Sequence, residues 1–392
     1  MAAGVYIHIP FCKSRCSYCD FATDVYRDSG AVERYVEAVC REIKGGNPSR
    51  GEGASLQRNA SGRQHTLPTD RVSALFVDTI YFGGGTPSLL EPGQVEKILE
   101  AVGDVFEVAQ GAEVTMEMNP ATVTVKSLTG YRELGVNRAS FGVQTFNERD
   151  LKLLARGHDA NDARLTFRLL RDAGFDNVSF DLIAGLPGQT MDDWRRNLEE
   201  AAAMRPEHLS LYLLEVHEGT PLAEQLRTGR RPIPDDELAA EMYETMIDTL
   251  AAVGYQQYEI SNFSLPGFES RHNTKYWRIE PVYGFGVSAH SFDGEERYAN
   301  ERDTLKYVRM IEEAENAEAY RERIDIASEA AFLGMRLNEG VDLDGYKKLF
   351  ETDLKDRALE LEEKGLVEIE SGRLRLTRRG MLFSNEVFAE FV

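Results

Sequence analysis

Strand-like and helix-like segments alternate through the first two thirds of this chain. Runs rich in β-branched and aromatic residues predict strands at residues 5–10, 79–83, 113–119, 138–144, 177–183 and 209–216. Apolar residues at three- and four-residue spacing predict helices at 31–43, 94–106, 125–134, 162–173, 192–204 and 235–253. Consecutive strand–helix units imply a parallel sheet with right-handed crossovers. We therefore predict an α/β fold that closes into a partial or full barrel.

Three cysteines follow the first predicted strand. Cys12, Cys16 and Cys19 form the pattern C-x3-C-x2-C. Such a triplet can ligate three irons of a 4Fe–4S cluster and leave the fourth iron open. Zinc is the alternative, but structural zinc sites usually take four protein ligands. The one further cysteine, Cys40, lies in an apolar helical run and is predicted to be a core residue.

Glycine and polar residues mark the ends of the following strands. Gly83, Gly84 and Gly85 come directly after the second strand, and consecutive glycines let the backbone approach a ligand closely. Polar residues occupy comparable places on later units: Glu117, Asn119, Gln144, Arg156 and Asp181. In barrels of this kind the chemistry lies at the carboxyl ends of the strands. Several such residues on successive units favour a binding site over solvent-facing caps.

The cysteine pattern, with Tyr18 before its last member, resembles the signature of the radical S-adenosylmethionine (SAM) enzymes. The resemblance implies a partial (β/α)6 barrel, a 4Fe–4S cluster on the three cysteines, and SAM on the open iron. It implies that Glu117 meets the SAM amino group, Arg156 its carboxylate, and Gln144 and Asp181 its ribose hydroxyls. The full set of SAM residues that it implies is Tyr6, Tyr18, Gly84, Gly85, Thr86, Glu117, Gln144, Arg156 and Asp181. It assigns no catalytic residue.

Within this superfamily the chain resembles the subgroup of oxygen-independent coproporphyrinogen III oxidases and HemW-like heme chaperones. The oxidases carry a further cysteine where this chain has Phe21, and they have a long arm where only eleven residues precede Cys12. The segment 272–277 matches H-N-x-x-Y-W of the chaperones. These features favour a chaperone that delivers heme to acceptor hemoproteins. The alternatives are an oxidase that decarboxylates propionates to vinyls, or a heme-modifying radical enzyme.

The resemblance makes His272 the candidate heme contact, because imidazole is a common axial ligand of heme iron. A hydrogen-bonded structural histidine is the alternative reading, and His290 is a second candidate. We expect His8 and His158 to be structural.

Composition suggests three regions. We expect a core at 1–234 with a disordered insertion at 45–73, an extension at 235–327 that carries H-N-x-x-Y-W, and a winged-helix-like module at 328–392. In the last region we expect helices at 330–337, 345–350 and 354–364, and then a hairpin of 366–369 with 374–377. A basic patch at the hairpin, made of Arg373, Arg375, Arg378 and Arg379, is compatible with DNA contact, but we favour a packing or lid role.

The charge and the cysteine content narrow the function further. A net charge of −21 argues against a nucleic-acid-binding surface over the whole molecule. Four cysteines, three of them clustered, are not a disulfide framework and suit a reducing compartment. The start of the chain has no signal-peptide pattern, and its apolar runs are short. We expect a cytoplasmic protein, and peripheral contact with a membrane surface is compatible with this composition.

Overall fold

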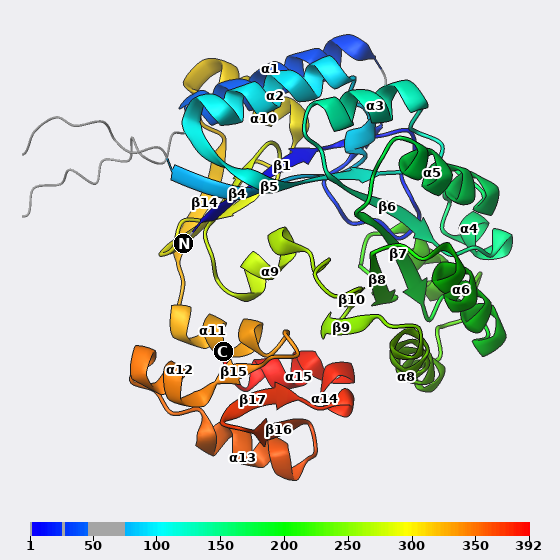
Figure 1. Cartoon of the computed structure of the whole chain (residues 1–392), viewed down its shortest axis with the longest axis vertical. Helices are drawn as coiled ribbons and strands as arrows, with labels where there is room; N and C mark the ends of the chain where they lie inside the picture. The colour runs from blue at the N-terminus through cyan, green and yellow to red at the C-terminus, as the bar shows by residue number, and fades with distance from the viewer. Residues whose placement is uncertain (1, 26–27, 46–74) are drawn as a thin grey trace, which may run out of the picture.

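A twelve-stranded sheet runs through the larger part of the chain and bends into an open arc (Figure 1). The computed structural model describes residues 2–25, 28–45 and 75–392, so all but the first residue of the predicted insertion lies outside the described residues. Six neighbouring parallel strands correspond to the predicted ones: β1 (Ala3–Ile9), β4 (Leu75–Gly84), β5 (Phe106–Met118), β6 (Arg138–Gln144), β7 (Val178–Ala184) and β8 (His208–Leu213). The α/β class and the partial barrel are therefore confirmed.

Helices between these strands cover the convex face of the sheet, as Figure 1 shows. They are α1 (Ser29–Gly45), α2 (Pro92–Val105), α3 (Val125–Glu133), α5 (Ala160–Asp172), α6 (Met191–Met204) and α8 (Asp236–Ala252). The prediction was wrong at Phe106, which begins β5 because α2 passes into the strand without a loop. The sixth predicted strand was too long at its end, because β8 stops at Leu213.

Six further strands extend the two edges of this sheet and were not predicted. One edge continues with β11 (Val282–Phe285), β12 (His290–Phe292), β13 (Glu296–Asn300) and β14 (Glu318–Arg323), and the other with β10 (Asn262–Ser264) and β9 (Gln256–Glu259). The helices α4 (Glu148–Leu153), α7 (Pro221–Arg227), α9 (Arg271–Trp277) and α10 (Thr304–Ala314) were also missed. All of these elements except α10 have seven residues or fewer, so periodicity carries little signal for them. Helix α10 has eleven residues, and its apolar spacing at Tyr307, Val308 and Ile311 was overlooked.

The two faces of the central strands differ in polarity. Val5 and Ile7 of β1 are fully buried in the main hydrophobic cluster with the helices. Tyr6 and His8 alternate with them and face the interior of the arc, since successive side chains of a strand point to opposite faces. The concave side of the sheet is therefore lined with hydrogen-bonding groups, which need partners.

A second hydrophobic cluster organises the end of the chain. This C-terminal module comprises α11 (Ile326–Gly334), β15 (Val341–Asp342), α12 (Leu343–Phe350), α13 (Lys355–Glu363), β16 (Val367–Glu370), β17 (Arg373–Leu376), α14 (Arg378–Leu382) and α15 (Ser384–Ala389). The predicted hairpin is confirmed, with Val367 opposite Leu376. The helix predicted at 330–337 is displaced, because Asp325 caps α11 at its start. The three predicted region boundaries stay predictions.

The four arginines in and directly after the hairpin are engaged within the protein. Arg378 pairs with Asp248 of α8 at 2.8 Å, and Arg373 donates to the Gly340 carbonyl at 2.7 Å. Arg375 pairs with two glutamates of β16, and Arg379 donates to the Lys364 carbonyl. These contacts hold the two strands of the hairpin together and fix the module against α8. Of the helices that the structure describes, none is long and apolar enough to cross a bilayer.

Candidate functional site

The cysteine loop lies at the carboxyl end of β1, between β2 (Phe11–Cys12) and β3 (Asp24–Val25). Ser17 fixes its centre. The Ser17 hydroxyl donates to the Leu153 carbonyl at 2.9 Å, its amide donates to the Leu154 carbonyl at 3.0 Å, and its carbonyl accepts from the Leu222 amide at 2.8 Å. These bonds tie the loop to the ends of α4 and α7. A loop held in this way presents its three thiols in a defined arrangement.

The donor set fits an iron–sulfur cluster better than a zinc ion. Cys12, Cys16 and Cys19 are half-buried free thiols. In the described part of the chain, no three His, Cys, Asp or Glu side chains gather closely enough to hold one metal ion. Structural zinc sites usually take four protein ligands, whereas a 4Fe–4S cluster takes each of three thiolates on a different iron. Cys40 packs against the main hydrophobic cluster, as predicted.

A chain of hydrogen bonds links two of the three thiols through the ends of neighbouring strands. Thr86 donates to the Cys12 sulfur at 3.5 Å, and Asn119 Nδ2 donates to the Thr86 hydroxyl at 2.6 Å. Arg156 Nη2 donates to Asn119 Oδ1 at 2.6 Å, and Arg156 Nη1 donates to the Cys16 sulfur at 3.4 Å. The structure therefore brings the predicted residues Thr86 and Arg156 to the cysteines. Asn119 connects these two residues by hydrogen-bonding to both of them.

Arg156 is the cation of this site. Burial disfavours its charge, but Tyr18, Cys16 and Asp181 more than offset that effect, so the pKa of Arg156 is raised and the guanidinium stays charged. Arg156 Nη2 also donates to the Gly142 carbonyl at 2.6 Å. Arg156 Nε is buried without a hydrogen-bond partner in the described residues. A buried cation with a free N–H beside the thiols suits an anionic group of a ligand.

Glu117 ends β5 on the concave side of the sheet. Its carboxylate accepts from the Tyr81 hydroxyl at 2.8 Å and from the Gly84 amide at 3.1 Å. Burial raises the pKa of Glu117, although these two hydrogen bonds counteract the rise. Gly84 has φ of +106°, and a Cβ there would lie 2.6 Å from His8 Cε1. The glycine run is therefore needed for close packing of β4 on β1, whatever it does for a ligand.

Gln144 and Asp181 lie on the next two strands. Gln144 ends β6 at a register irregularity with φ of +68°. Asp181 of β7 is paired with Gly142 on one side and Ser210 on the other. Burial and the nearby Glu117 carboxylate raise the pKa of Asp181 to about 7. A carboxyl group with this pKa can gain or lose its proton near neutral pH.

Two predicted structural histidines lie close to the site. His8 Nε2 donates to the Ala22 carbonyl at 3.0 Å, and its Nδ1 accepts from the Tyr6 hydroxyl at 3.2 Å. His8 thereby anchors the end of the cysteine loop to β1. Burial, and then the Arg156 charge, lower the pKa of His158 to about 4, so His158 is neutral at neutral pH.

His272 lies away from the cysteines, near the amino ends of β1 and β4. Its Nδ1 is 2.9 Å from the Thr79 hydroxyl, and its Nε2 is 3.1 Å from the Tyr276 hydroxyl. The ring stacks on Tyr81 at 5.1 Å between centroids. Burial, Lys275 and then Arg138 lower the pKa of His272 to about 3. The imidazole is therefore neutral, and both of its nitrogens already have partners.

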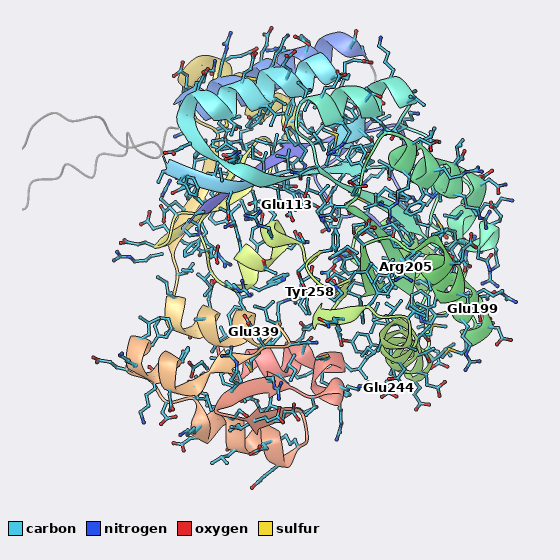
Figure 2. The ribbon with its side chains drawn as sticks, in the orientation of Figure 1. Glu113, Glu199, Arg205, Glu244, Tyr258 and Glu339 are labelled. Carbon is cyan, nitrogen blue, oxygen red and sulfur yellow. The ribbon has the colours of Figure 1, made fainter. Side chains whose placement is uncertain are left out.

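Helix α9, which contains His272, is fixed at both ends. The Glu113 carboxylate accepts from the amides of Arg271 at 3.1 Å and His272 at 3.0 Å, and Figure 2 labels Glu113 beside this helix. Lys275 forms ion pairs of 2.8 Å with Asp78 and 2.9 Å with Glu280. These contacts dock α9 against the concave side of the sheet.

Sequence reasoning missed three residues that shape the site, namely Ser17, Tyr81 and Glu113. The Glu113 signal was present, since Glu113, Thr115 and Glu117 alternate along β5 and so share a face. Ser17 gives no such signal, because its partners at Leu153 and Leu154 are distant in sequence.

Comparison with known proteins identifies families and relatives that this chain is similar to. The model of the radical SAM superfamily matches residues 6–201, and that of the HemN C-terminal domain matches residues 322–383. The heme chaperone HemW of Bacillus subtilis (strain 168) is 35% identical over 99% of this chain and 99% of its own length.

The chain belongs to the radical SAM superfamily, in the HemW family.

Further proteins are similar to this chain over most of its length. The heme chaperone HemW of Lactococcus lactis is 32% identical over 99% of this chain and 97% of its own. Radical S-adenosyl methionine domain-containing protein 1, mitochondrial, from Bos taurus is 32% identical over 97% of this chain and 85% of its own. The structure of coproporphyrinogen III oxidase (HemN) from Escherichia coli aligns with a TM-score of 0.82 at 23% identity, over 100% of this chain and 90% of that one. At that identity the likeness shows the fold alone.

Replacing the loop cysteines should remove the cluster. We expect Cys12→Ala, Cys16→Ala and Cys19→Ala each to lose bound iron, sulfide and the cluster absorbance after anaerobic reconstitution, because each thiolate would hold one iron. Cys40→Ala is the matched control and should keep all three signals, since Cys40 packs in the core. Full iron content and cluster absorbance in a variant that carries all three substitutions would show that the ligand assignment is wrong.

Proposed function

We propose that this chain is a heme chaperone, which binds heme, a 4Fe–4S cluster and SAM and delivers heme to acceptor hemoproteins. The observation that carries the proposal is likeness over almost the whole length to proteins named heme chaperone HemW, at 35% and 32% identity. The likeness to coproporphyrinogen III oxidase rests on a shared fold at 23% identity. The chaperone reading therefore has the stronger support.

The cysteine loop also favours the chaperone over the oxidase. Phe21 occupies the position at which the oxidase signature has a further cysteine. Its side chain is 65% exposed beside the loop. A phenyl ring supplies no ligand for iron, so this loop offers three thiolates and no fourth.

The residues around the loop fit the two cofactors. Cys12, Cys16 and Cys19 would hold three irons, and Arg156, with its buried free N–H, would meet the SAM carboxylate. Glu117 would accept from the amino group. The remaining residues proposed for SAM are Tyr6, Tyr18, Gly84, Gly85, Thr86, Gln144 and Asp181. When bound, a reduced 4Fe–4S cluster can supply one electron to the SAM sulfonium.

We propose a cytoplasmic location, because free thiols that ligate iron need a reducing compartment. All four cysteines are free in this structure. The proposed partners are heme and acceptor hemoproteins.

Two anaerobic incubations test the proposed function. The reconstituted chain should bind heme stoichiometrically, with a Soret band that shifts on binding. Incubated instead with coproporphyrinogen III, SAM and a reductant, it should yield no protoporphyrinogen in pigment analysis. Turnover of coproporphyrinogen III would contradict the chaperone reading and favour the oxidase.

The affinity for SAM should rise with pH around the pKa of Asp181, which is about 7. Below this pKa the carboxyl group is protonated. Above it the ionised group accepts hydroxyl protons more strongly, by about 1 kcal/mol per hydrogen bond, so affinity should increase about fivefold. Equilibrium dialysis of radiolabelled SAM across this pKa measures the change.

Asp181→Asn should abolish this pH dependence. Glu42→Gln is the matched control, because Glu42 also has a pKa of about 7 but hydrogen-bonds Tyr307 and the Gly286 amide on the other side of β1. It should leave the pH dependence unchanged. An unchanged pH dependence in Asp181→Asn would contradict the assignment of this carboxyl group to SAM.

A further inference from the structure

A cavity of about 550 Å³ lies between α9 and the C-terminal module. Trp277 and Phe292 line it from the barrel side, and Ala330, Tyr346 and Leu349 line it from the module. Its volume falls within the roughly 300–1,000 Å³ that is typical of sites for drug-sized ligands. Figure 1 shows α11 of the module below α9, and Figure 2 labels Glu339 on the module in the same region.

The wall contributed by α12 is unusually apolar for a surface. The Leu349 side chain is 74% exposed, although it is a large aliphatic group on the edge of the cavity. Phe350 follows it and also lines the cavity. Aromatic side chains stand on both walls, and aromatic groups stack on flat conjugated ligands. The cavity therefore suits a broad, planar, apolar molecule.

The two ends of α9 contact different parts of the protein, the sheet and the cavity. His272 packs inward on the sheet with both ring nitrogens engaged, at 2.9 Å to Thr79 and 3.1 Å to Tyr276. Trp277, at the other end of the same helix, lines the cavity, and its indole Nε1 is buried without a partner in the described residues. The histidine of H-N-x-x-Y-W thus positions the helix, while the tryptophan reaches the cavity.

We propose that this cavity is the heme site, and that Trp277 rather than His272 is the residue of the motif that contacts the macrocycle. The inference rests on the proposed function, namely that the chain binds heme. It names the site at which binding occurs.

Arg278 is the one cation among the described residues that line the cavity, where Glu339 and Asp342 are the two carboxylates, and it can meet one propionate of heme. Arg278 lines the cavity, is half-exposed, and donates to Glu339 at 3.1 Å. An exposed ion pair of this kind contributes only about 0–1 kcal/mol, so Arg278 can exchange its partner for a ligand carboxylate at little cost. Arg336, which is not among the residues that line the cavity, pairs with Glu259 and stacks on the Trp277 ring at 4.2 Å, so it holds the ring in place.

The cavity would hold heme by contacts with the two faces of the porphyrin ring and not by a protein ligand to the iron. The described residues that line it include no histidine, cysteine or methionine, and the Tyr346 hydroxyl donates to the Ala327 carbonyl at 2.7 Å. Heme that has no strong bond between its iron and a protein ligand can leave the cavity without breaking such an iron–ligand bond. This property suits transfer to an acceptor. Iron-free protoporphyrin IX should therefore bind to the same cavity.

Heme titration of full-length variants, followed by Soret absorbance, tests the site. Leu349→Asp places a carboxylate on the apolar wall, and Ala330→Trp fills the cavity. Each should weaken heme binding about tenfold or more, which corresponds to ~1.4 kcal/mol. Both should also weaken binding of protoporphyrin IX, measured by its fluorescence.

Leu359→Asp is the matched control. Leu359 lies on α13 of the same module, is 52% exposed and does not line the cavity. The Leu359→Asp variant should bind heme with the affinity of the wild type. Because Leu349 is highly exposed, Leu349→Asp should keep the wild-type circular dichroism spectrum and thermal unfolding temperature.

The outcomes separate this inference from the proposed function. Heme binding by Leu349→Asp and Ala330→Trp with wild-type affinity would overturn the cavity as the heme site and leave the chaperone proposal standing. Absence of heme binding by the wild type would overturn the proposed function and, with it, this inference.

Discussion

The polar concave face of the sheet needs hydrogen-bonding partners, and α9 supplies them. Glu113 accepts from the first amides of the helix, and Thr79 bonds to His272. A buried polar group without a partner costs about 1–3 kcal/mol, so these contacts decide where α9 lies. Tyr81 then connects the helix to the proposed cofactor site, because its ring stacks on His272 and its hydroxyl donates to Glu117.

This arrangement places the two proposed binding regions on either side of one short helix. The cysteine loop lies at the carboxyl ends of the strands, where the hydrogen-bonded chain through Asn119 joins Cys12 to Cys16. The apolar cavity lies beyond α9, against the C-terminal module. With heme in this cavity, as proposed, the cargo would lie apart from the cluster, whereas an oxidase must bring the porphyrin to the radical chemistry.

Sequence reasoning found the parts of the fold whose signal is local. The six central strands are long runs of β-branched and aromatic residues, and the polar residues at their ends were visible as a series. Most strands at the sheet edges were missed because they are short, whereas β14 is as long as β8 but is almost entirely exposed and carries four charged residues. The surroundings of His272 could not be read from its neighbours in sequence, since Thr79 is 193 positions away. The cavity was missed for the same reason, because segments distant in sequence build its walls.

The central claim is that this chain carries heme and gives it up to another protein. Anaerobic mixing of the heme-loaded, cluster-reconstituted chain with an apo-hemoprotein such as apomyoglobin tests it most directly, with the Soret band followed over time. We predict that the spectrum of the acceptor's holo form appears while that of the loaded chain declines, with heme recovered chemically unchanged. Heme that stays on the chain, or that is recovered in a modified form, would contradict the account.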